Sequence, residues 1–355
     1  MSVSNAGDLS SFASTIMLPF QPATVFHKVD VEINWITQEG QGTSGPIQAS
    51  FQGTIQDPLS KAWTKTLREV GYCLTGDPFS GSATGGFSSP ITVDPTSKTR
   101  SYAGSAYFLP ANKTGSFCSG GIGSYAFMPM TDFATESGEE ELRELFKKYP
   151  AENKDMERYN LLRTIFEDPK ESTGSAFMFL AQTFTQNLDP HNFVSLGISL
   201  LHPLSRGSVH IASADATQPP IIDPKYLSNE LDVEFMSRHL RFMETIAESQ
   251  PLASFIKPGG KRNHEMAHVK DLEAAKDYVR TTTISNNHPA CSCPMMPRDK
   301  GGVVDAQLLV YGTANLRIVD ASVMPLIPRG NIQSSVYAVA ERAADLIKED
   351  HHIQK

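Results

Sequence analysis

The residues best suited to chemistry lie near the C-terminus, where His288 and Asn331 fall in two segments rich in proline and glycine. Histidine has an unperturbed pKa near neutrality, so it can take up a proton and return it. Asparagine exchanges no proton but orients a substrate oxygen through hydrogen bonds. We expect both residues in loops, because a scaffold can bring loop residues together from distant positions.

Two other chemistries are possible around His288. Cys291 lies close to it in sequence and suggests a Cys-His nucleophile, but neighbours in sequence need not point toward each other. Cys291 and Cys293 together with His288 suggest a metal site, yet no fourth ligand is evident, so no metal is predicted. A histidine followed by proline is also common in ordinary loops.

Periodicity indicates the elements that must position these residues. Asp57-Pro58 is a typical helix start, apolar residues follow at helical spacing, and Gly71 ends the pattern. Charged helices are predicted at 139–149 and 154–167, and further helices at 232–249, 269–281 and 333–348. Strands are predicted at 29–36, 175–185, 193–201 and 208–213, with a strand-like run at 316–319 and turns across 75–90.

Composition narrows the functional class. The 355 residues are 40% hydrophobic and 20% charged, enough for one large or two ordinary domains. A net charge of −8 without a basic stripe argues against nucleic acid. Four cysteines are too few for a disulfide scaffold, and the N-terminus shows neither a signal peptide nor a membrane span. We therefore expect a cytoplasmic protein with a small-molecule substrate.

The C-terminal segment resembles a known family. His288-Pro289, the run 301–331 (GGVVDAQLLVYGTANLRIVDASVMPLIPRGN) and the ending AERAADLI are similar to the signature of the glucose-methanol-choline (GMC) flavin oxidoreductases, fungal members above all. The resemblance implies FAD as cofactor, His288 as the catalytic base and Asn331 as its partner. It also implies that Asp320 and Ala321 approach the flavin phosphate and ribityl chain, and that Gly330, Asn331 and Ile332 lie near its ring.

Two departures from the family pattern stand out. A GMC enzyme opens with a G-x-G-x-x-G loop that holds the flavin pyrophosphate. The near-fit from Gly121 to Ala126 follows no apolar strand and precedes Pro129, so we interpret it as a turn leading into a strand. A glycine of the family's histidine motif is here Cys291; at positive φ this would cost on the order of 1 kcal/mol.

The predicted fold is α+β. We expect an antiparallel substrate-domain sheet with covering helices, plus a remnant of an α/β FAD-binding domain. Residues 1–110 would be a partial N-terminal GMC region, 111–286 the substrate-binding domain, and 287–355 the C-terminal signature with its terminal helix. The flavin-domain opening and an internal flavin-domain segment are expected to be missing from this chain.

Three functions remain open at this point. The first is FAD-linked oxidation of an alcohol group in fungal secondary-metabolite biosynthesis. The second is a redox-neutral cyclase or dehydratase that reuses the same pocket without flavin. The third is an inactive chain, or one completed by another polypeptide that supplies the FAD-binding part.

Overall fold

The computed structural model describes most of the chain from residue 58 onward. The described ranges are 58–80, 83–94, 99–102, 123–130, 136–151, 156–180, 193–260 and 266–352, with 47, 49–50, 262, 264 and the backbone of 11–19. The expected strand at 29–36, the expected N-cap Asp57 and the near-fit residue Gly121 lie outside these ranges.

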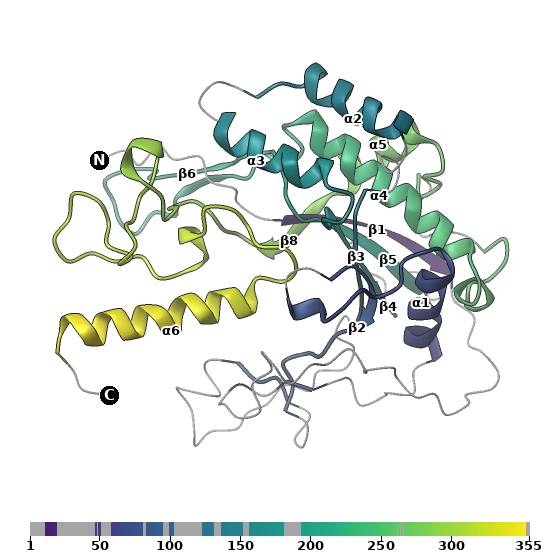
Figure 1. The fold of residues 1–355 in the computed structure, drawn as a ribbon, viewed down its shortest axis with the longest axis horizontal. Coiled ribbons are helices and arrows are strands. Elements are labelled where there is room, and N and C mark those ends of the chain that lie inside the picture. Colours follow the sequence, from purple (N-terminus) through teal and green to yellow (C-terminus); the bar gives the residue numbers. More distant parts are fainter. Residues whose placement is uncertain are drawn as a thin grey trace.

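The centre of the fold is a six-stranded sheet in the order β2-β3-β4-β5-β1-β8 (Figure 1). Every pairing is antiparallel. The strands are β1 (Ser11–Pro19), β2 (Gly85–Ser88), β3 (Ser124–Met128), β4 (Gly174–Phe179), β5 (Phe193–Leu200) and β8 (Ile284–His288). A separate pair joins β6 (Ser208–His210) to β7 (Ile221–Asp223). Mixed helices and an antiparallel sheet confirm the α+β class.

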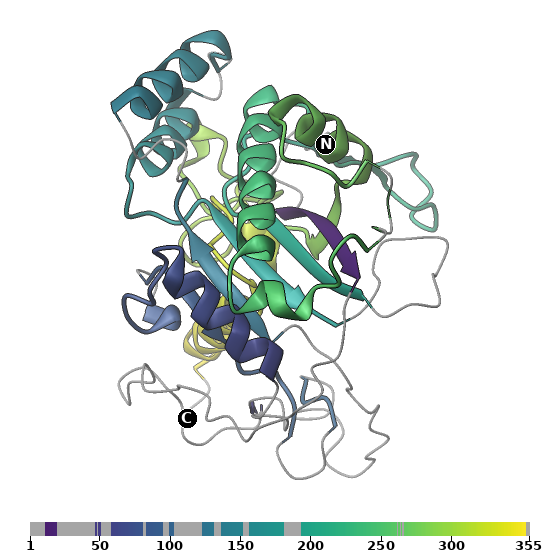
Figure 2. The same ribbon diagram turned by 90° about the vertical axis from the view of Figure 1, so that its right-hand side faces the viewer.

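Helices cover one face of this sheet. Figure 2 shows α1 (Pro58–Glu69) and α4 (Glu230–Glu248) in front of the strands, and the C-terminal segment with α6 (Gln333–Asp350) behind them. The other helices are α2 (Glu136–Lys148), α3 (Met156–Glu167) and α5 (Leu272–Thr282). All six were expected within a few residues of these bounds, and Gly71 follows α1 with a φ of +94°.

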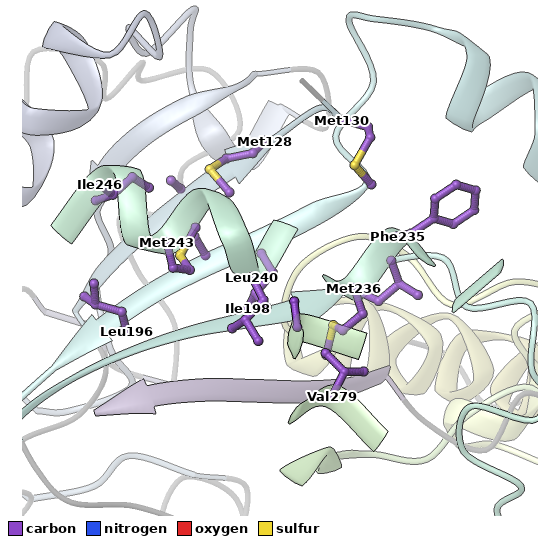
Figure 3. Packing of buried hydrophobic residues seen from close by; sticks show 14 of the residues in the cluster. Met128, Met130, Leu196, Ile198, Phe235, Met236, Leu240, Met243, Ile246 and Val279 are labelled. Atoms are coloured by element: carbon purple, nitrogen blue, oxygen red, sulfur yellow. The ribbon is translucent and has the colours of Figure 1, made fainter. Parts of the chain in front are cut away.

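The period of two along β3 separates the core from the opposite face. Ala126 and Met128 are buried under the helices, whereas Tyr125 and Phe127 project from the other side. Strands β4 and β5 continue the pattern, so that one apolar layer fills the space between sheet and helices (Figure 3). Its members include Leu196, Ile198, Phe235, Met236, Leu240, Met243, Ile246 and Val279.

Three local expectations were wrong. His288 is the last residue of β8 rather than a loop residue, because Ser11 of β1 pairs with it. The run 316–319 forms no strand; only an isolated bridge links Arg317 to Leu309, and Leu316 is 53% exposed. The turn-rich stretch 75–90 contains β2, whose glycines fit closely against other backbone and side chains.

Among the described helices, none combines the length and the apolar character needed to cross a bilayer.

A buried histidine couples the stability of this fold to pH. His239 of α4 is 3% exposed and contacts the Thr173 hydroxyl at 3.0 Å through Nε2. Burial lowers its pKa to about 3, so the folded protein holds it neutral while the unfolded chain protonates near pH 6.5. The stability that the neutral imidazole contributes is fully present above pH 6.5. It is lost as pH falls toward 3, by up to about 1.4 kcal/mol per pH unit.

Urea unfolding of His239→Gln between pH 7 and pH 4 should therefore show a shallower loss of stability than the parent. The exposed His210 in β6 offers a matched control, and His210→Gln should keep the parent slope. Equal slopes for the His239 variant and the parent would contradict the assignment.

Candidate active site

A chain of polar side chains links β8, β3 and the start of α6. Nε2 of His288 lies 2.8 Å from Oδ1 of Asn331, and Nδ2 of Asn331 donates to the Tyr125 hydroxyl at 3.1 Å. The structure thus brings together the two residues that the sequence singled out, and adds a tyrosine. Burial raises the pKa of Tyr125, although its bond to Asn331 acts the other way, so the phenol is neutral.

Backbone pairing and an apolar cluster together place His288 beside Asn331. The amides of Cys291, Cys293 and Met295 donate to the carbonyls of Ala321, Ser322 and Val323, at 3.2, 2.8 and 2.8 Å. Below this ladder an apolar cluster packs the two segments against α6; it consists of Ala290, Cys291, Met324, Ile327 and Ile332. Because Ala290 and Ile332 belong to one cluster, their near neighbours His288 and Asn331 are held close together.

The hydrogen bonds around His288 depend on its protonation state. Nδ1 lies 3.1 Å from the Asn287 carbonyl, so both ring nitrogens face oxygen acceptors in this structure. Two acceptors satisfy an imidazolium, because a neutral imidazole has a single N–H. A neutral ring with its proton on Nδ1 requires the Asn331 amide to turn over, with Nδ2 donating to Nε2 and the Tyr125 hydroxyl donating to Oδ1. Asn331 can thus serve both states of the histidine.

Asn331 and Tyr125 line a cavity of about 730 Å³. Aromatic rings form one wall, with the Phe87 ring centroid 5.3 Å from that of Phe127 and 6.2 Å from that of Tyr125. The other lining residues include Ser89, Thr164, Ile165, Asp168, Glu171, Ser175, His202, Arg329, Gly330, Ser334 and Ser335. A cavity of this size and mixed lining is typical of small-molecule sites.

His202 is a neutral member of this lining. Burial, with smaller contributions from Arg329 and Arg158, lowers its pKa to about 4. It can therefore offer one donor and one acceptor at neutral pH. Sequence reasoning missed Tyr125, His202 and Arg329. The alternation in β3 was a usable signal for Tyr125, since Ala126 and Met128 mark the opposite face as core.

The residues expected near a flavin are only partly gathered at the cavity. Gly330 lines it with a φ of +83°, and a Cβ there would lie 3.2 Å from the Phe127 ring. Ile332 instead packs in the apolar cluster beneath α6. Asp320 is exposed and caps the short helix η7 (Ala321–Val323), accepting from the Ser322 amide at 2.8 Å. Ala321 contributes its carbonyl to the backbone ladder.

The described residues fit the ring of a flavin better than its ADP half. Gly330, Asn331 and Ser334 at the start of α6 offer a flat approach and polar donors beside the cavity. In the stretch 121–126, which resembles a nucleotide-binding loop, Ser124 is however already the first residue of strand β3, inside an antiparallel sheet. A pyrophosphate loop leads instead into a helix. Within the described ranges we find no cradle for the pyrophosphate.

Cys291 has the left-handed backbone that its glycine-like position suggested. Its φ is +68°, its side chain is 3% exposed, and it belongs to the apolar cluster under α6. A thiol packed in this way is a poor nucleophile. In the part of the chain that the structure describes, no three metal-binding side chains gather into a possible site.

The left-handed backbone predicts that, at position 291, the glycine variant is more stable than the alanine variant, which is the reverse of the usual order. Cys291→Ala keeps the Cβ that clashes at positive φ, whereas Cys291→Gly removes it, so the glycine variant should be more stable by about 1 kcal/mol. Position 293 has no positive φ. There, the glycine variant should be the less stable one. Denaturant unfolding of the four variants measures both differences, and the same order at both positions would refute the strain.

Comparison with known proteins shows which family the C-terminal part of the chain resembles. Residues 203–340 match the family model described as GMC oxidoreductase. The chain is 36% identical over 191 residues to the GMC oxidoreductase family protein Mala s 12 of Malassezia sympodialis, covering 50% of this chain and 30% of that protein. It is 39% identical over 161 residues to patulin synthase of Aspergillus clavatus, covering 44% of this chain and 25% of that protein.

A solved structure shares the fold. A fungal aryl-alcohol oxidase matches with a TM-score of 0.52 and 27% identity, over 65% of this chain and 39% of the other. The matches thus span less than a third of the two curated relatives. Residues 203–340 therefore resemble the GMC oxidoreductase family, and the similarity to both relatives and to the solved structure points the same way.

Proposed function

We propose that this protein oxidises an alcohol group on a small molecule, with His288 as the base and FAD as the cofactor. The observation that carries the proposal is the 2.8 Å contact between His288 and Asn331 at the edge of an aromatic-walled cavity. Acid–base chemistry needs a proton-exchanging group within hydrogen-bond reach of a bound substrate, and this pair provides one.

The roles of the two residues follow from their hydrogen bonds. Nε2 of His288 is the nitrogen that contacts Asn331, which itself lines the cavity, whereas Nδ1 is directed at the Asn287 carbonyl. A substrate hydroxyl that enters beside Asn331 would give its proton to Nε2 as hydride leaves the carbon. The imidazolium that results is held between the oxygens of Asn331 and Asn287, and Tyr125 keeps the Asn331 amide in place.

FAD, when bound, supplies the hydride acceptor that no side chain can replace. Gly330, Asn331 and Ser334 are the residues placed to face its ring, since all three line the cavity. The ADP half would have to be held by residues beyond the described ranges or by another chain. The first option keeps the reaction within one polypeptide, and the second makes activity depend on a partner.

The substrate class is supported by the cavity wall and by two relatives. Phe87, Tyr125 and Phe127 present flat apolar surfaces suited to a planar or aromatic alcohol. One similar structure is named as a fungal aryl-alcohol oxidase, and one relative as a patulin synthase. We accordingly place the reaction in fungal secondary-metabolite biosynthesis.

The proposal predicts that His288→Ala lowers turnover of an aryl alcohol by about 100-fold or more while flavin content stays unchanged. Flavin bands in the visible spectrum report cofactor, before and after FAD is added, and reduction of an artificial electron acceptor reports turnover. His210→Ala, at the exposed last residue of strand β6, is the matched control and should behave as the parent.

The competing functions give different results in the same experiment. A protein that binds no flavin and yields product at the oxidation state of its substrate, whatever acceptor is present, would be a redox-neutral enzyme. Undiminished turnover in His288→Ala would exclude the histidine as the base.

A further inference from the structure

Arg329 carries a buried guanidinium that the described protein leaves nearly unsatisfied. Its side chain is 9% exposed and lines the cavity, two residues before Asn331. Neither Nη1 nor Nη2 has a hydrogen-bond partner in the part of the chain that the structure describes. The nearest carboxylate is that of Glu171, with Oε2 at 3.6 Å from Nη1, beyond hydrogen-bond distance.

Such an arrangement is unfavourable without a further partner. Moving a guanidinium out of water costs several kcal/mol, and attraction to a carboxylate offsets this only with good hydrogen-bond geometry. Glu171 is 43% exposed and makes no such bond. Burial accordingly lowers the pKa of Arg329, with Glu171 acting in the opposite direction. The guanidinium thus lies in the cavity lining beside Glu171, closed off from water, with both terminal nitrogens lacking a hydrogen-bond acceptor among the described residues.

The surroundings of Arg329 indicate the kind of anion that would fit. Its Cζ lies 5.6 Å from the Phe127 ring centroid, in cation–π range, so the planar guanidinium borders the aromatic wall. The planar fork of arginine matches a carboxylate with two parallel hydrogen bonds. His202 is neutral and can add a single hydrogen bond. The cavity thus combines a flat apolar wall with a fork for a planar anion.

We propose that Arg329 binds a carboxylate of the substrate, so that the alcohol oxidised by this protein is a flat, apolar-bodied hydroxy acid. The proposal rests on the proposed function for the alcohol end of the substrate, which lies at His288. The carboxylate end is independent of it, because binding at Arg329 requires no turnover. On binding, the Glu171 side chain turns to solvent and yields its place to the substrate carboxylate.

Calorimetric titration of the full chain with benzoate and with benzamide tests the carboxylate end. The two probes have the same shape and differ in charge, and neither contains an alcohol. Benzoate should bind at least about 10-fold more tightly than benzamide, a difference that a charged hydrogen-bond pair supplies. Equal affinities would overturn the proposal.

Three variants assign the effect to Arg329. Arg329→Met should lower the affinity for benzoate by about 10- to 100-fold without changing the affinity for benzamide. Arg329→Lys should have an intermediate affinity for benzoate, since lysine keeps the charge but not the planar fork. Glu171→Gln should instead tighten benzoate, because it removes the competing carboxylate. A purely structural Arg329–Glu171 pair predicts no tightening, so this variant decides the matter even if Arg329→Met does not fold. Arg298→Met, at an exposed position outside the cavity, is the control.

Turnover then separates the two proposals. For the flavin-loaded protein, kcat/KM should be at least about 10-fold higher for 3- or 4-(hydroxymethyl)benzoate than for the corresponding methyl ester, and the preference should vanish in Arg329→Met. Tight benzoate binding without oxidation of any alcohol would refute the proposed function alone. Oxidation with equal preference for acid and ester would refute the carboxylate site alone.

Discussion

The site depends on a short backbone ladder between two segments that are distant in sequence. The amides of Cys291, Cys293 and Met295 pair with the carbonyls of residues 321–323. Backbone bonds of this kind fix register as well as distance, so the residues before and after the ladder have little freedom left. The two segments run in parallel, so the chain must also turn back after Val323; the apolar cluster that joins Ala290 and Cys291 to Ile332 holds this return, and the side chains of His288 and Asn331 meet.

The second constraint is the two-sided character of β3. Ala126 and Met128 belong to the helix-covered core, and the Trp63 indole of α1 donates to the Tyr125 carbonyl at 3.1 Å. With the strand held in this way, Tyr125 and Phe127 must face the C-terminal segment. A shift of one residue would exchange the two faces, burying the phenol and removing both the support of Asn331 and the aromatic wall. Core packing and the site therefore share one register.

Helices were the part of the fold that local pattern predicted best. The capping signals around α1, and the periodic apolar residues of α4 and α6, operate within a few residues and needed no distant partner. The run 316–319 failed for the opposite reason. Its apolar, β-branched composition suits a strand, but a strand also needs neighbours, and here a single bridge to Leu309 is formed. The error for His288 was the opposite one. We expected it in a loop, but its pairing with Ser11 of β1 makes it the last residue of strand β8.

By itself, the sequence determined the α+β class and the family motifs, and it marked His288 and Asn331 as candidate site residues, because residue type decides what chemistry a side chain can do. It also indicated the left-handed backbone at Cys291, since the family has glycine there. Only the tertiary structure decided which other groups join the pair. Tyr125 and Arg329 come from different segments; alternation in β3 gives only the face of Tyr125, and neither type nor spacing marks Arg329. Their importance lies in contact and burial, which exist only once β3, β8 and the start of α6 are packed together.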